Sequence, residues 1–89
     1  MLQLKELQCF IAVYEAGGFG RAAEVLDTVQ SCVSMRMRRL EKSVGAPLFD
    51  RLHRGIRPTA KGEMLYRHAT RVFREIGELE SAVKNRDAA

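Results

Sequence analysis

The chain lacks the sequence features of several protein classes. It contains no apolar run approaching the roughly 20 residues that a transmembrane helix needs. Its first residues do not form a basic segment followed by an apolar one, as a secretory signal would. Its two cysteines, Cys9 and Cys32, lie at apolar or small positions of helical patterns, which favours reduced thiols over a disulfide framework. We therefore expect a cytoplasmic protein without a membrane partner.

The sequence also lacks the groups that would indicate catalysis or metal binding. There is no pair of carboxylates, no nucleophile beside a base and no phosphate-binding loop, so we do not expect an enzyme. His53 and His68, together with the two cysteines, do not have metal-ligand spacing. Neither a metal site nor a cofactor is expected in this domain.

Positive charge is concentrated in the middle of the sequence. Residues 36–74 hold eleven Lys and Arg against three Asp and Glu, a net charge of +8, whereas residues 1–35 and 75–89 each have a net charge of −2. With 89 residues the chain is one small domain, without a repeat or a low-complexity tail. Such a basic region is typical of a protein that binds a polyanion, most commonly DNA or RNA. An acidic protein surface or a membrane would also attract it.

The segment Thr28–Glu41 has the pattern of an amphipathic helix. Its apolar residues recur at spacings of four, three and four, which predicts one buried face. They are Val33, Met37, Leu40 and Val44. The opposite face carries the candidate base-contacting residues Gln30, Ser31, Ser34, Met35 and Arg38. A small polar face of this kind fits a major groove, although an ordinary surface helix would show the same pattern.

The residues before this segment predict a helix-turn-helix. Periodic apolar residues predict a helix over residues 4–16, with Leu4 on its buried face, that ends at Gly17 and Gly18. A short helix then runs from Phe19 to about residue 27. Only about three residues separate Leu26 from the candidate recognition helix, for which we expect Thr28 as N-cap. Gly45 and Pro47 predict the end of the recognition helix.

Residues 48–59 predict a small β-hairpin wing. Two short extended pieces, Phe49–Leu52 and Ile56–Pro58, flank a turn at Arg54-Gly55. The hairpin carries more cations than solubility requires, although a plain solvated surface would also accommodate them. The candidates for contacts with the DNA backbone or the minor groove, in the wing and elsewhere, are Arg21, Thr28, Arg36, Arg51, His53, Arg54 and Arg57.

A long helix is predicted from Thr59, its expected N-cap, to about Asn85. Apolar residues recur along it with gaps of four, three, four, three and four, which is typical of a seam that packs on another helix. The seam consists of Leu65, Ala69, Val72, Ile76, Leu79 and Val83. We expect its first turns to pack on the domain itself and the remainder to pack on a second copy of the chain.

Together these residues resemble a known family. The chain contains Gly17-x-Phe19, Ala22-Ala23, Gln30-Ser31-x-Val33-Ser34 and Pro47-Leu48-Phe49-x-Arg51, followed by Thr59 and Gly62. Over residues 2–85 this order is similar to the N-terminal domain of LysR-type transcriptional regulators. The resemblance implies a mainly α fold. A winged helix-turn-helix of three helices and a β-hairpin would span residues 1–59, and a dimerisation or linker helix would span residues 60–89.

The resemblance also implies a function. Two chains would pair through the linker helix and place their recognition helices in the major groove of a partly palindromic double-stranded operator, with the basic wings in the minor groove. In such regulators a further domain binds a small-molecule effector and makes the control of transcription responsive to it. That domain is not in these 89 residues, and we expect a DNA-binding part of a longer, nucleoid-associated regulator. The full-length protein would be a homodimer or a higher oligomer.

Some positions depart from the family pattern, and other functions stay open. Gly18 and Gly20 replace common hydroxyl residues, and the hydroxyl of Thr28 is shifted by one position. A protein-interaction module, whose heptad helix binds a partner, would produce a similar pattern. Another winged-helix regulator, such as the molybdate-responsive type, would as well. The Pro-Leu-Phe-x-Arg motif at residues 47–51 favours the LysR type.

Overall fold

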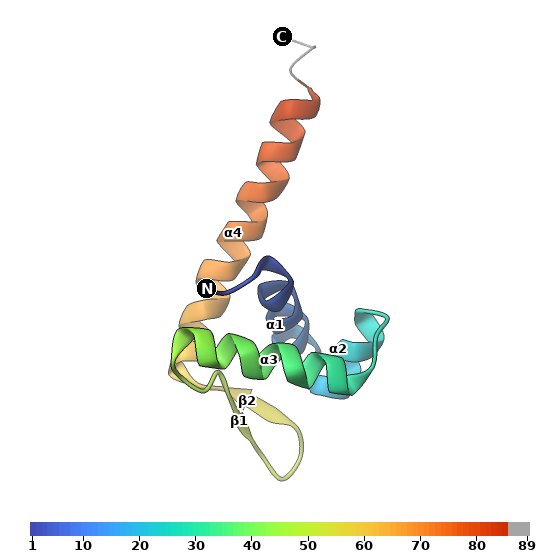
Figure 1. The fold of residues 1–89 in the computed structure, drawn as a ribbon, viewed down its shortest axis with the longest axis vertical. Helices are drawn as coiled ribbons and strands as arrows, with labels where there is room; N and C mark the ends of the chain where they lie inside the picture. Colours follow the sequence, from blue (N-terminus) through green and yellow to red (C-terminus); the bar gives the residue numbers. More distant parts are fainter. Residues whose placement is uncertain (86–89) are drawn as a thin grey trace.

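The computed structural model describes residues 1–85, and its chain forms three helices, a hairpin and one long helix (Figure 1). The elements are α1 (Leu4–Ala16), α2 (Phe19–Val25), α3 (Gln30–Val44), β1 (Phe49–Arg51), β2 (Ile56–Pro58) and α4 (Ala60–Lys84). This order confirms the expected mainly α winged helix-turn-helix followed by a long helix. Residues 86–89 of the expected linker segment lie outside the described residues.

The core lies where α1, α2 and α3 meet. Its largest fully buried side chains are Phe10, Met37, Leu40, Leu48, Val13, Val33 and Cys9. Phe49 joins this core from the first residue of β1, with its ring centroid 5.3 Å from that of Phe10. The hairpin is therefore attached to the helices through an aromatic side chain (Figure 1).

Two residues expected on buried faces are exposed. Leu4 is 52% exposed because the first turn of α1 borders an open cleft beside α3. Val44 is 38% exposed because it is the last residue of α3, directly before the chain turns at Gly45. The left-handed backbone of Gly45, with φ at 75°, confirms the predicted end of this helix.

The prediction that Thr28 caps α3 is wrong. The helix begins at Gln30 after an extended Val29, and no side chain caps it. The Thr28 N–H instead donates to the Ala23 carbonyl at 2.9 Å, while Asp27 takes a left-handed conformation with φ at 55°. The hydroxyl residue therefore belongs to the closing turn of α2, and the N-cap position of α3 falls one residue later than predicted, at Val29.

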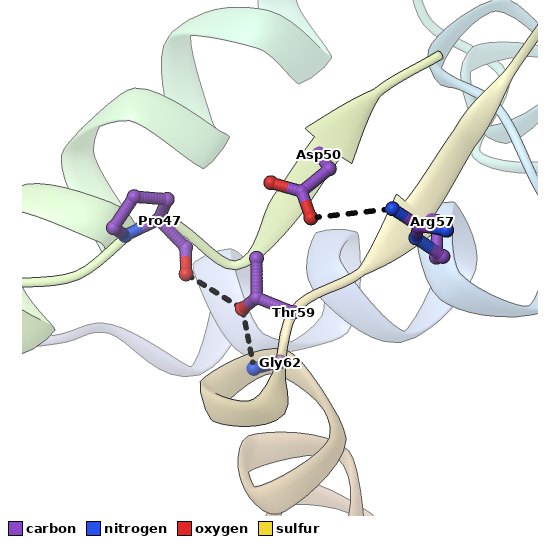
Figure 2. A network of polar contacts seen from close by, with 5 residues as sticks. All are labelled: Pro47, Asp50, Arg57, Thr59 and Gly62. Carbon is purple, nitrogen blue, oxygen red and sulfur yellow. Dashed lines mark hydrogen bonds and ion pairs between the residues drawn. The ribbon is translucent and has the colours of Figure 1, made fainter.

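The hairpin is antiparallel, and Asp50 pairs with Arg57 in its register. β1 ends at Arg51, one residue earlier than predicted, and the Leu52 N–H donates to the Gly55 carbonyl at 3.0 Å across the tip. Gly55 has φ at 82°, a left-handed conformation that favours glycine at this turn. The guanidinium of Arg57 and the carboxylate of Asp50 are 4.0 Å apart on the exposed side of the hairpin (Figure 2).

Thr59 connects the wing to α4, as predicted. Its hydroxyl oxygen accepts the Gly62 N–H at 3.0 Å and donates to the Pro47 carbonyl at 2.8 Å (Figure 2). The backbone of Gly62 passes so close to the Leu48 carbonyl oxygen that an added Cβ would clash with it. The first turn of α4 is thus held directly against the strand that opens the wing.

A pair of tyrosines fixes α4 on α1. The rings of Tyr14 and Tyr66 stack with centroids 3.7 Å apart and an angle of 6° between their planes. The Tyr14 hydroxyl donates to Glu63 at 2.7 Å, and the Tyr66 hydroxyl donates to Glu15 at 2.6 Å. These hydrogen bonds to carboxylates raise the pKa of both tyrosines, with desolvation as a further cause. Beyond this junction α4 extends away from the core (Figure 1).

Candidate nucleic-acid interface

The core determines which face of α3 points outward. Val33, Met37 and Leu40 are buried, so the opposite side of the helix is left uncovered. All five candidate base-contacting residues lie on or beside that side. Gln30, Ser31, Met35 and Arg38 are exposed, and Ser34 is half-buried. A helix packed on one side and uncovered on the other fits into a major groove.

Gln30, at the start of α3, lies close to the start of α2. A Cβ added to Gly20 would be 3.4 Å from the Gln30 Oε1 atom, about van der Waals contact. The Gln30 side chain therefore lies over the start of α2. The sequence interpretation treated Gly20 only as a lost hydroxyl, because the proximity of these two residues depends on the packing of α2 against α3.

Arg51 is held beside α3 by an aromatic ring. Its guanidinium carbon lies 4.8 Å from the centroid of the Phe19 ring. A cation–π contact of this kind contributes about 0.5–1 kcal/mol at an exposed site. Phe19, Ser34, Arg38 and Arg51 line a cleft of about 110 Å³ between α2, α3 and β1. The sequence interpretation placed Phe19 on the apolar stripe of the second helix and did not predict its contact with Arg51, which depends on how the wing packs on α2.

The tip of the wing meets the turn between α1 and α2. Arg21 and Arg54 line the same cleft of about 480 Å³, whose other walls are glycines of the turn and of the hairpin tip. The structure thus brings together two predicted backbone contacts that are far apart in the sequence. His53 and Arg57 are exposed nearby on the hairpin. The ion pair of Arg57 with Asp50 is also exposed, so it constrains Arg57 only weakly.

Two predicted backbone contacts lie elsewhere. Thr28 is half-buried in the turn after α2. Arg36 is half-buried on the α1 side of α3, where it borders a cleft with the first turn of α1. Burial raises the pKa of the neighbouring Cys9 thiol, and the Arg36 guanidinium partly opposes that rise. The structure therefore does not group Arg36 with the arginines of the wing.

The apolar seam of α4 divides into two parts. Ala69 is 1% exposed and Leu65 packs against the core, so the first turns are covered by the domain itself. Leu79 and Val83 are 59% and 57% exposed on the part of α4 that extends beyond the core. Across residues 1–85, no helix is both long and apolar enough to cross a membrane.

Comparison with known proteins finds one family model and several related transcriptional regulators that match the chain. The family model described as bacterial regulatory helix-turn-helix protein, lysR family, matches residues 4–63. The transcriptional regulator CfxR of Cupriavidus necator is 37% identical over 83 residues, which are 93% of this chain and 26% of CfxR. The chain thus spans about a quarter of the length of that relative.

Two solved structures are similar over nearly their whole length. The crystal structure of the CbnR DNA-binding domain in complex with DNA has a TM-score of 0.85 and 36% sequence identity, covering 97% of each chain. The BenM DNA-binding domain in complex with benA site 1 DNA has a TM-score of 0.90 and 30% identity, covering 98% of this chain and 97% of that one. Both similar domains were crystallised with DNA.

Proposed function

Because this chain belongs to the lysR family of bacterial regulatory helix-turn-helix proteins, we propose that it reads a partly palindromic DNA operator as a dimer. The family is one of transcription regulators, not enzymes, and residues 4–63 carry its helix-turn-helix. The observation that carries the proposal is the uncovered polar face of α3. The opposite face of this helix is buried in the core and fixes its orientation. Two similar domains crystallised with DNA support it.

The exposed face of α3 would read base edges in the major groove. The amide of Gln30 can form two hydrogen bonds with an adenine, and the guanidinium of Arg38 can do the same with a guanine. Ser31 and Ser34 offer short hydroxyls that donate or accept. Met35 offers an apolar surface to a thymine methyl group. Sequence preference is assigned to these five residues.

The wing and the turn before α2 would hold the DNA backbone. Arg21 and Arg54 share one cleft, so a single stretch of backbone can contact both. Arg51 is kept near Ser34 and Arg38 by its contact with Phe19. The arginines at the hairpin tip suit a narrow minor groove, where the negative potential is enhanced. These contacts give affinity and orientation, with little preference for sequence.

The exposed part of α4 would pair two chains, and its charges favour an antiparallel arrangement. Residues 60–74 have a net charge of +3 and residues 75–84 a net charge of −2. Parallel helices would place like charges side by side, whereas antiparallel helices place opposite charges together. The apolar residues Val72, Ile76, Leu79 and Val83 would form the contact. Effector-responsive control by a longer regulator is proposed on family membership alone.

Selection of bound duplexes from a random pool, at about physiological salt, tests this function. We expect enrichment of two inverted half-sites with A/T-rich character. The Arg54→Gln variant should bind selected and random duplexes more weakly by a similar factor, and its salt slope should fall by about 0.9 per chain. Binding without enrichment would remove the base-reading role from α3. The absence of binding to any duplex would contradict the function itself.

A further inference from the structure

Two clefts carry cations at separate places around the helix-turn-helix, and only the second includes residues of α3. The first, between the wing and the start of α2, holds Arg21 and Arg54. The second is lined by the first turn of α1 and the middle of α3. Figure 1 shows that α1 and the wing lie on different sides of α3. The volume of the second cleft is about 520 Å³, comparable with the 480 Å³ of the first. The second cleft contains Arg36 together with Lys5 and Arg39, to which no role has been assigned so far.

The cations of the second cleft are not neutralised by carboxylates. The one ion pair among residues 1–85 joins Arg57 and Asp50, so none of the three cations has an acidic partner there. Glu6 also lines the cleft, but it is buried and its Oε1 accepts the Gln3 N–H at 3.1 Å as part of the helix cap. The cleft therefore has an excess of positive charge available to an anion.

We propose that Lys5, Arg36 and Arg39 bind the DNA backbone on the side of the recognition helix remote from the wing. The ligand class is a run of phosphodiesters in double-stranded DNA. This proposal rests on the proposed insertion of α3 into a major groove. A helix in a major groove has a phosphate backbone on each side, and the wing with Arg21 would contact only one of these backbones. The cations of the second cleft would contact the other.

The position of the cleft favours DNA over an acidic protein as the ligand. Met35 lines the cleft and also belongs to the face assigned to base contact, so the cleft continues that face without interruption. Arg38 and Arg39 are consecutive residues and lie about 100° apart around the helix axis. Arg38 therefore lies on the face assigned to base contact, and Arg39 lines the adjoining second cleft. A duplex contacting Arg38 and Met35 thus passes close to Arg39 and Lys5.

The test removes two of the charges without disturbing the fold. Lys5→Gln and Arg39→Gln change exposed residues, whereas Arg36 is left unchanged because it is half-buried beside Cys9. We expect the double variant to lose affinity for selected and random duplexes by a similar factor. The slope of log affinity against log salt should fall by about 1.8 per chain, since each phosphate contact contributes about 0.9. Lys84→Gln, at the far end of α4, is the charge-matched control for each single substitution.

Ethylation of individual phosphates locates the contact. In the wild-type protein, ethylation on both sides of the major groove should interfere with binding. In the double variant, which keeps Arg36, interference should weaken only on the side remote from the wing. Unchanged slope and interference, alongside weakened binding by Arg54→Gln, would overturn this proposal and leave the proposed function intact. Unchanged DNA binding with lost control of transcription in the full-length regulator would assign the cleft to an acidic protein, again overturning it.

Discussion

At the scale of single residues, Gly62 shows how closely the wing and α4 are joined. A methyl group at this position would meet the Leu48 carbonyl oxygen, which already accepts the Thr59 N–H at 3.0 Å. We expect Gly62→Ala to lower the free energy of unfolding by about 1–3 kcal/mol, because backbone atoms must shift to accommodate it. Denaturant titration measures this effect.

The matched control for that variant is Gly77→Ala in the same helix. Gly77 has open space where its Cβ would lie, so alanine there should raise helix stability by up to about 1 kcal/mol. Equal effects of the two substitutions would mean that helix propensity alone governs residue 62 and that its contact with Leu48 is relieved without cost.

Gln30 carries the sharpest prediction about specificity at this scale. We expect Gln30→Ala to relax the preference at one base position of each half-site, by about 1–3 kcal/mol of discrimination between bases. Affinity for random duplexes should be almost unchanged. Competition binding with duplexes altered at single positions measures this, and equal losses on selected and random duplexes would show that Gln30 contacts the backbone instead.

At the scale of elements, the junction of α1 and α4 predicts a pH dependence. Hydrogen bonds to Glu63 and Glu15 raise the pKa of Tyr14 and Tyr66 above the ordinary value of 10.0. The folded state therefore favours the protonated hydroxyls. Their stabilising effect is complete below about pH 10 and is lost as the pH rises through the raised pKa values.

We expect the free energy of unfolding to fall above pH 10, and to fall less steeply in the Tyr14→Phe, Tyr66→Phe double variant. Phenylalanine keeps a stacked pair of rings but has no hydroxyl to titrate. Denaturant unfolding at a series of pH values on both sides of about pH 10 measures how steeply the free energy of unfolding falls with pH in the wild type and in the double variant. Identical slopes would mean that these hydroxyls do not contribute to the alkaline loss of stability.

Most elements could be predicted from the sequence because their signals are local. The apolar period of α3, the glycine at its end and the threonine that caps α4 act within a few residues of one another. The start of α3 could not, because the turn at Asp27 and Thr28 depends on how α2 closes. The site divides in the same way. The outward face of α3 follows from periodicity. That Arg21 and Arg54 line one cleft, while Arg36 lines another, depends on the tertiary fold.

At the scale of the whole molecule, the proposed pairing of two α4 helices can be tested by cross-linking. In antiparallel helices paired over their exposed halves, residue 76 of one chain lies near residue 76 of the other. Residues 83 of the two chains are then more than about 15 Å apart, since each residue advances about 1.5 Å. A disulfide needs Cα atoms within about 7 Å.

We therefore expect Ile76→Cys to form a covalent dimer under mild oxidation and Val83→Cys not to do so. The wild-type chain is the control, because it already contains the buried Cys9 and the half-buried Cys32. Non-reducing electrophoresis separates the products. Efficient cross-linking of Val83→Cys would indicate parallel helices and would contradict the charge argument.

The stacked tyrosines also have a mechanical meaning in such a dimer. They lie near the base of α4, and the helix from Tyr66 to its end at Lys84 extends over roughly 27 Å at about 1.5 Å per residue. A rotation of about 10° at this contact would displace the far end of the helix by about 5 Å, more than the roughly 3.4 Å between successive base pairs. In the proposed dimer, the contact between Tyr14 and Tyr66 would set the angle between α4 and the rest of the domain. We would then expect this contact to set the distance between half-sites that the dimer accepts.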